Sequence, residues 1–217
     1  MKKILFLLLV TFFVSGVSQA IAYDYGVAEG DKIKWDGSYS GGAFSLESQG
    51  SADKYKWSTF CVEHTKPIYN NTWMTVAKIG DTNSTNTGSL FGNSVAWLYW
   101  NFNQGTLAGD LSNTNVQKDL QYVIWNQLGQ AHEAYAFYDS GLVEQWLNSA
   151  LSDTLWTNNG RVQILQLTSQ NGKIDYQDVL IAGTGGTNPV PEPTTMALLG
   201  IGLLGLVAVG RKKATQN

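Results

Sequence analysis

The chain has 217 residues, of which 43% are hydrophobic, 12% aromatic and 14% charged, with a formal net charge of −3 and one cysteine. This length allows one domain with short additional segments, and the aromatic content is too high for a disordered chain. A single cysteine excludes an intramolecular disulfide framework, and with only two histidines beside it a zinc site is disfavoured. The acidic balance disfavours nucleic-acid binding. We expect neither a metal nor a cofactor.

Residues 1–22 are typical of a secretory signal peptide. Lys2 and Lys3 precede an apolar run over residues 4–17, and Ala20 and Ala22 form a small-x-small cleavage site. We expect cleavage after Ala22, with Ala20 as the near alternative. The competing interpretation is an uncleaved membrane anchor.

Residues 189–217 have three parts in a fixed order. A proline-rich segment comes first, and it is stiff because each proline fixes its own φ. An apolar stretch over 196–209 follows, shorter than the ~20 residues of a comfortable transmembrane helix. A basic cluster ends the pattern and favours a cytoplasmic C-terminus. The candidate sorting residues are Pro191, Glu192 and Pro193, with Arg211, Lys212 and Lys213 in the basic tail.

This C-terminal segment resembles the PEP-CTERM sorting signal of Gram-negative, exopolysaccharide-producing bacteria. The resemblance implies export through the inner membrane, transient anchoring by a short transmembrane helix, and cleavage by an exosortase near Pro-Glu-Pro. The protein would then reach the cell surface or the extracellular matrix. An ordinary C-terminal anchor is the alternative.

The part of the chain between the two signals has nine basic and sixteen acidic side chains. The signals themselves contain five of the fourteen lysines and arginines and one of the seventeen acidic residues.

Within residues 23–188, apolar residues recur with one spacing in some segments and with another spacing in others. Alternating polar and apolar residues predict strands, and apolar residues three and four apart predict helices. Thr114 and Gln117 form a capping-box pattern, and Gly129 stands where a C-terminal glycine cap belongs. Strands followed by helices and further strands indicate an α+β domain. We expect strands at 32–35, 41–46, 55–63 and 72–79, helices near 90–105, 114–129 and 142–151, and closing strands at 162–167 and 174–181.

Two residues of this domain require an explanation. Cys61 is the one cysteine of an exported protein and lies on the strand expected at 55–63. Gln121 follows Leu120 on the helix expected at 114–129, at the border of the buried stripe, where its carboxamide would need a hydrogen-bond partner.

The two surrounding motifs together resemble the thioester domains of Gram-positive surface adhesins. That family has an aromatic-Cys pair on a strand and an apolar-Gln-x-Ala-Ile-Trp motif on a helix. Phe60-Cys61 matches the first motif, and residues 120–125 match the second with Val123 in place of alanine. The resemblance implies a thioester-domain-like α+β fold, with a strand-rich N-terminal part, central helices and closing β-strands. It also implies a thioester between the Cys61 sulfur and the Gln121 carbonyl, formed with loss of ammonia.

A thioester would need a dry pocket that slows hydrolysis. Tyr55, Trp57 and Trp125 are candidates for the pocket wall. Glu63 and His64 are possible proton-transfer helpers, on sequence proximity alone. If Cys61 faces the pocket, Glu63 shares its side of the strand and His64 points away.

Three functional hypotheses are consistent with these residues. The leading hypothesis is a surface protein that attaches covalently to an amine-bearing partner in a single-use reaction, without acting as an enzyme. The second is a non-covalent extracellular matrix or adhesion protein, for example of a biofilm, in which Cys61 is a small buried hydrophobe and Gln121 a structural amide. The third is a carbohydrate-binding module for an exopolysaccharide matrix, suggested by eight tryptophans. A module of this kind should expose several aromatic side chains on one flat face.

Overall fold

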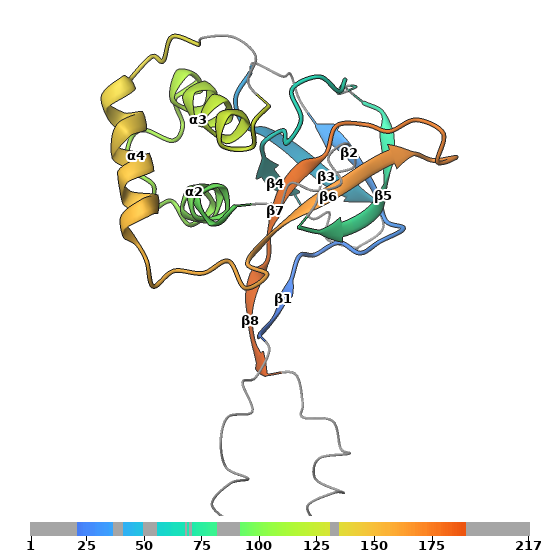
Figure 1. Cartoon of the computed structure of the whole chain (residues 1–217). Helices are drawn as coiled ribbons and strands as arrows, with labels where there is room; N and C mark the ends of the chain where they lie inside the picture. The colour runs from blue at the N-terminus through green and yellow to red at the C-terminus, as the bar shows by residue number, and fades with distance from the viewer. Residues whose placement is uncertain are drawn as a thin grey trace, which may run out of the picture. The chain divides into compact units, whose positions relative to one another are not determined.

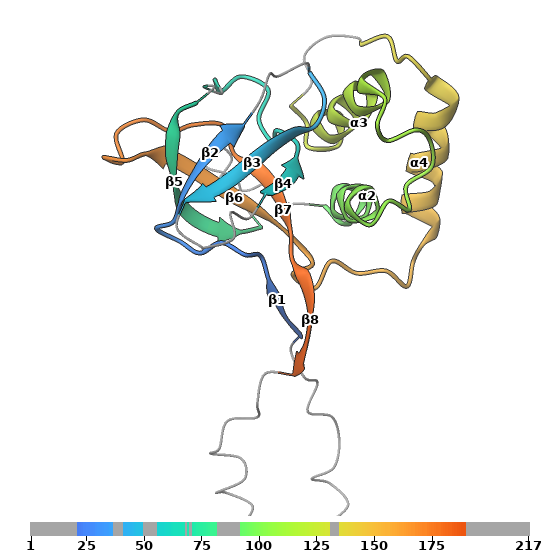
Figure 2. The same cartoon turned by 180° about the vertical axis from the view of Figure 1, so that it is seen from behind.

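The structure is a computed structural model that describes residues 21–36, 41–49, 56–67, 69, 71–81, 92–130 and 135–189. Residues Tyr23–Gly185 form one compact unit, and the two terminal segments belong to a second one. In the compact unit, strands gather on one side and three helices on the other (Figure 1). The view from behind shows the same division into a sheet and a helical layer (Figure 2).

The strand-rich part precedes the helices, and two more strands of the main sheet follow them. The first strands are β1 (Ile21–Asp24), β2 (Lys32–Asp36), β3 (Phe44–Gln49), β4 (Lys56–Thr59) and β5 (Trp73–Gly80). The helices are α2 (Asn93–Gln104), α3 (Thr114–Gln127) and α4 (Ser140–Ser152), and the last strands are β6 (Val162–Ser169), β7 (Val179–Ala182) and β8 (Thr184–Pro189). Strands β1 and β8 pair with each other, and the other six form one sheet.

The six-stranded sheet has the order β4-β3-β2-β5-β6-β7 and is antiparallel throughout. Its two outermost strands in this order, β4 and β7, nevertheless contact each other. A sheet whose first and last strands meet must curl, and a curled sheet covers strand edges that would otherwise be open to other chains.

The curl closes just after β4, where residues 60–62 run antiparallel to residues 178–180; we call this pairing the seam. The N–H of Leu180 donates to the carbonyl of Phe60 over 3.1 Å, and the N–H of Val62 donates to the carbonyl of Asp178 over 2.9 Å. Cys61 lies opposite Val179 between these two hydrogen bonds. Cys61 is therefore at the centre of the closure.

Helix α2 fastens the seam through one tyrosine. The hydroxyl of Tyr99 lies 2.8 Å from the carbonyl oxygen of Ser58 and 3.1 Å from that of Leu180. The hydroxyl of Thr59 also donates to the Leu180 carbonyl, over 2.5 Å. Tyr99 thus connects the end of β4, the seam and the helical layer.

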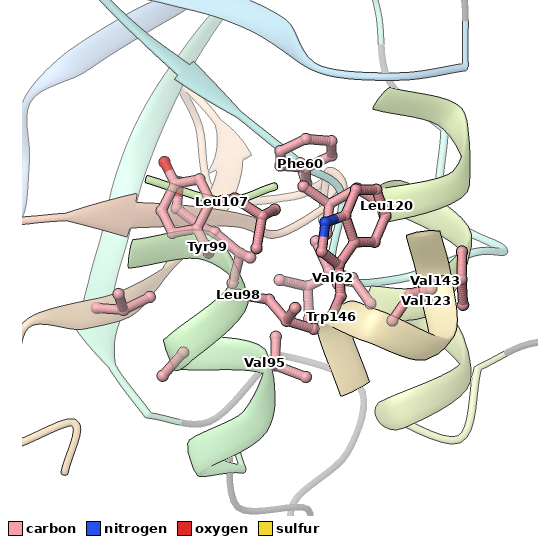
Figure 3. Packing of buried hydrophobic residues seen from close by; sticks show 14 of the residues in the cluster. Phe60, Val62, Val95, Leu98, Tyr99, Leu107, Leu120, Val123, Val143 and Trp146 are labelled. Carbon is pink, nitrogen blue, oxygen red and sulfur yellow. The ribbon is translucent and has the colours of Figure 1, made fainter. Parts of the chain in front are cut away.

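Alternating side chains of the seam divide the hydrophobic core into two clusters. Phe60 and Val62 belong to the cluster between the helices and the sheet, which Figure 3 shows around Trp146. Cys61 belongs to the second cluster, together with Trp57. The second cluster has members from all six strands and therefore fills the inside of the curled sheet. It comprises Ile33, Trp35, Phe44, Leu46, Trp57, Cys61, Met74, Val76, Leu165, Leu167, Tyr176, Val179 and Ile181.

The structure is compatible with the expected α+β class and corrects two details. The strands expected at 55–63 and 174–181 are shorter, because β4 ends at Thr59 and β7 begins at Val179. The capping-box prediction is wrong: the side chain of Asn113 caps α3 by accepting the N–H of Asn115, and the Gln117 side chain donates to the carbonyl of Leu111. Asparagine is a better N-cap than threonine, so the cap lies one residue earlier than expected.

Removing the hydroxyl of Tyr99 should destabilise the seam. The Tyr99→Phe substitution preserves the ring and leaves buried carbonyl oxygens with one donor fewer, which should lower the free energy of unfolding by about 1–2 kcal/mol. Urea unfolding measures this difference. The control is Tyr138→Phe, because Tyr138 is 63% exposed and should tolerate the change. Equal losses in the two variants would contradict a special role for Tyr99.

Candidate functional site

The side chain of Gln121 forms two hydrogen bonds with the main chain of Cys61. The N–H of Cys61 donates to Oε1 of Gln121 over 2.7 Å, and Nε2 of Gln121 donates to the carbonyl of Cys61 over 2.8 Å. Gln121 is 0% exposed and Cys61 is 1% exposed. The two residues singled out from the sequence are therefore in direct contact and shielded from water.

The geometry of the seam explains why Cys61 needs this partner. Opposite residues in an antiparallel pair alternate between those that exchange hydrogen bonds and those that do not. Cys61 and Val179 are a pair of the second kind, because the hydrogen bonds are made by the residues on either side of them. The N–H and carbonyl of Cys61 thus point away from β7. Gln121 satisfies both, so its amide takes the place of a further strand.

Helix α3 holds Gln121 in place through its apolar stripe. Leu120 and Ile124 are buried in the cluster between the helices and the sheet. The side chain of Asn113 caps the first turn, and Gly129 follows the helix with a φ of +68°, which suits glycine. Because the helix is fixed at both ends and along one face, the carboxamide has little freedom to leave Cys61.

Two of the three expected wall residues belong to, or pack against, the buried cluster that contains Cys61. Trp57 shares its cluster, and Trp125, one turn after Gln121, packs against that cluster. Within the described part of the chain, the buried Nε1 of Trp125 has no hydrogen-bond partner. The ring of His64 meets the Trp125 ring edge-on, with centroids 4.8 Å apart. Tyr55 lies outside the described residues.

The two proposed helpers have different environments. Glu63 is 0% exposed, and its carboxylate accepts the N–H of Asp178 over 3.2 Å and pairs with Lys66 over 3.4 Å. Its main-chain carbonyl accepts a hydrogen bond from Gln177. These contacts fasten the segment after Cys61 to the segment before β7. His64 is exposed, and its ring contacts that of Trp125. The proton-transfer roles of both residues stay predictions.

Sequence reasoning missed the residues that complete the site. Tyr99, Lys66, Gln177 and Asp178 all support the seam, and none was singled out. The sequence offered one signal for these residues, namely polar side chains near the ends of the expected strands. Only the pairing of segments that are distant in the chain shows which residues those side chains contact.

Several features expected from the sequence lie outside the described residues. The sorting residues 191–193 and 211–213 and the apolar stretch 196–209 are outside the described ranges, as are residues 1–20. None of the described helices has the length and apolar character needed to cross a membrane. Among the residues described, no three His, Cys, Asp or Glu side chains gather in a way that could hold a metal ion.

The comparisons with known proteins concern the C-terminus. Residues 189–213 match the family model of the PEP-CTERM protein-sorting motif. No curated protein and no solved structure matches the chain significantly. The match confirms the sorting motif expected from the sequence, and it indicates an exported protein that an exosortase processes and that reaches the cell surface.

Replacing Gln121 by leucine should destabilise the domain. Leucine has a similar volume but takes both hydrogen bonds of the amide away from the buried main chain of Cys61, which should lower the free energy of unfolding by about 2–5 kcal/mol. The control is Gln127→Leu, because Gln127 lies on the same helix and is exposed. Urea unfolding of the three proteins measures the effect. A Gln121 variant as stable as the Gln127 variant would show that the amide is dispensable.

Proposed function

We propose that Cys61 and Gln121 form an internal thioester through which this exported protein attaches covalently to an amine-bearing partner. The observation that carries the proposal is the direct, buried contact between the Gln121 carboxamide and Cys61. Because the sulfur is two bonds from the Cα of Cys61, the carboxamide is held within one side-chain length of its nucleophile. Once the sulfur and Cδ of Gln121 meet in a near-attack geometry, such positioning can supply ~7–11 kcal/mol of the barrier to reaction.

The bonds balance in two steps. In the first, the Cys61 sulfur attacks Cδ of Gln121, the C–N bond breaks, and the thiol proton leaves with the nitrogen as ammonia. In the second, an amine attacks the same carbon, the C–S bond breaks, and the thiol is restored as the amide forms. Each molecule reacts once with its partner, so this is attachment and not turnover.

The surroundings of the pair favour the first step. The developing negative charge on Oε1 of Gln121 would be met by the N–H of Cys61, which already lies 2.7 Å away. A preorganised main-chain donor of this kind stabilises an oxyanion without reorganisation during the reaction. Trp57 and Trp125 keep the sulfur in an apolar environment, which would protect a thioester from hydrolysis.

The second candidate function is a non-covalent extracellular matrix or adhesion protein. The same two hydrogen bonds favour it, because they satisfy the main chain of Cys61 and give Gln121 a structural purpose on their own. A flat tryptophan platform for carbohydrate is not favoured, since all eight tryptophans are described and each is buried or half-buried.

The intact mass of the exported protein separates the two candidates. A thioester lowers the mass by one ammonia, and added methylamine restores an amide at Gln121 and raises the mass accordingly. Peptide mapping should place methylamine on Gln121 and a free thiol on Cys61. The Cys61→Ser and Gln121→Leu variants should have their calculated masses and take up no methylamine.

The mass result decides against the thioester if the purified protein has its unmodified mass and titrates with one free thiol under all conditions of export. Gln121 would then be structural, and the non-covalent function would stand.

The sorting motif predicts a change of location on mutation. Replacing Pro191, Glu192 and Pro193 by alanine removes the matched core of the signal and should leave the protein in the cell membrane when an exosortase is present. Fractionation with immunoblotting measures the membrane and released pools. A triple variant that is released as efficiently as the wild-type protein would contradict processing at this motif.

A further inference from the structure

We infer that the end of α4 and the connection from α4 to β6 form a membrane-contacting face, which lies on the lipid surface while the C-terminal tail anchors the protein. The inference is independent of the proposed thioester. It rests on the sorting motif, which indicates an exported protein with a membrane-anchoring tail. The observation that carries it is a pair of exposed leucines beside a band of aromatic side chains that leads to the exit of the tail.

The two leucines flank the C-terminal end of α4. Among the described residues, they are the most exposed large apolar side chains, with Leu155 at 94% and Leu151 at 69%. Leu151 lies in the last turn of the helix, and Leu155 lies in the connection over residues 153–161. A single exposed leucine is ordinary on a protein surface. These two require an explanation because aromatic side chains adjoin them.

Three tryptophans come together around this connection. The guanidinium carbon of Arg161 lies 5.4 Å from the ring centroid of Trp156 and 5.8 Å from that of Trp100 on α2. Trp97, one turn earlier on α2, donates its indole N–H to the carboxylate of Asp153 over 3.0 Å. The three rings and Arg161 are half-buried, so part of each is open to the surface. With Tyr23, they form what we call the aromatic band: Tyr23, Trp97, Trp100, Trp156 and Arg161.

The other end of the aromatic band is where the chain leaves the compact unit. Tyr23 is the first residue of that unit, its ring meets Trp100 edge-on with centroids 6.2 Å apart, and its hydroxyl accepts from Nε of Arg161 over 3.1 Å. The N–H of Gly183 donates to the carbonyl of Arg161 over 2.8 Å, two residues before the unit ends at Gly185. The connection runs beneath α2 to the end of β7 (Figure 1). The leucines and the exit therefore belong to one continuous face.

The length of the linker decides which side of the unit can meet the membrane. Ten residues, 186–195, separate the compact unit from the apolar stretch at 196–209, and they span at most about 40 Å when fully extended. A compact unit of about 160 residues has a radius of about 20 Å, so a linker that passed around it to the opposite side would need about 50 Å. The opposite side is therefore out of reach of the bilayer, whereas the face at the exit is within reach.

The composition of this face suits a lipid surface. Tryptophan and tyrosine favour the headgroup region, because their rings are apolar and each carries one polar group. The neighbouring leucines would enter the boundary with the acyl chains. Arg161 and Asp153 have opposite charges, so the contact should be apolar in kind and little changed by salt. Two leucines bind weakly on their own, but the tail makes the contact intramolecular and raises its effective concentration.

A fluorescent label tests the contact in the full chain, purified from cells without an exosortase and reconstituted in vesicles of phosphatidylethanolamine and phosphatidylglycerol. Bimane is attached to Leu155→Cys and, as the matched control, to Ile174→Cys. Ile174 is also exposed and aliphatic, but it follows the far end of β6 from Arg161. Cys61 is buried and should take up no label under native conditions, which the wild-type protein verifies.

Two quenchers distinguish lipid from water and from protein. A lipid with a nitroxide at the start of its acyl chain should quench the label at 155 several-fold more than the label at 174, and iodide present on both sides of the bilayer should show the reverse order. Iodide quenching at 155 as strong as at 174 would overturn the inference. Protection of position 155 from both quenchers would also overturn it, because protein, such as a second copy of the chain, would then cover the leucines.

A second set of variants shows whether the leucines make the contact. The label is moved to Thr154→Cys, which is exposed beside Leu155, and Leu151 and Leu155 are replaced by serine. We expect the lipid quenching to fall several-fold while the urea unfolding midpoint stays unchanged, and Ile174→Ser with the same label should leave the quenching as it was. Lipid quenching that persists without the leucines, at an unchanged unfolding midpoint, would contradict their role and overturn the inference.

Discussion

The structure depends on one unusual pairing, in which a glutamine side chain serves both hydrogen-bonding groups of a single main-chain residue. The seam closes a curled sheet, and closure leaves the N–H and carbonyl of Cys61 pointing away from β7. An open strand edge at this position would be buried against helices and could not be satisfied by water. Gln121 removes the conflict with one amide. The helical layer and the sheet are thereby connected by polar contacts as well as by their apolar core.

The structural and the chemical interpretations of Gln121 have the same physical basis. An amide that must satisfy a particular residue has to be fixed in position, and the proposed acyl transfer would use the same fixed amide. In the proposed reaction, the departing ammonia would take one hydrogen-bond donor away from the site. The site would gain reactivity in that reaction only by giving up part of what stabilises the seam.

Local patterns in the sequence were enough for the three helices and the strands of the six-stranded sheet, but not for β1, for β8 or for the closure. The apolar stripe of α3 and the alternation around Cys61 have short periods, and the structure has both. The contact between Phe60 and Leu180 joins segments far apart in the chain, and no local pattern encodes it. The prediction of the helix cap was wrong for another reason. Asn113 and Thr114 are both suitable N-cap residues, and asparagine is the more favourable of the two. Gln121 was recognised because a polar residue beside a buried stripe needs a partner. Its pair of hydrogen bonds with the main chain of Cys61 could be seen only once the seam was known.

The order of the last strands has a mechanical consequence. Gly183 alone separates β7 from β8, so tension that passes the pairing of β8 with β1 reaches β7 next, and β7 is the strand that lies against Cys61. Without a covalent bond, such a load on β7 is resisted by its pairing with β6, by the hydrogen bonds of the seam and by the hydroxyl of Tyr99. An amide formed at Gln121 would instead place the attached partner on α3, one helix away from the loaded strand. The path of force would then cross the Gln121–Cys61 contact, and the strength of the attachment would be that of two hydrogen bonds and the core around them.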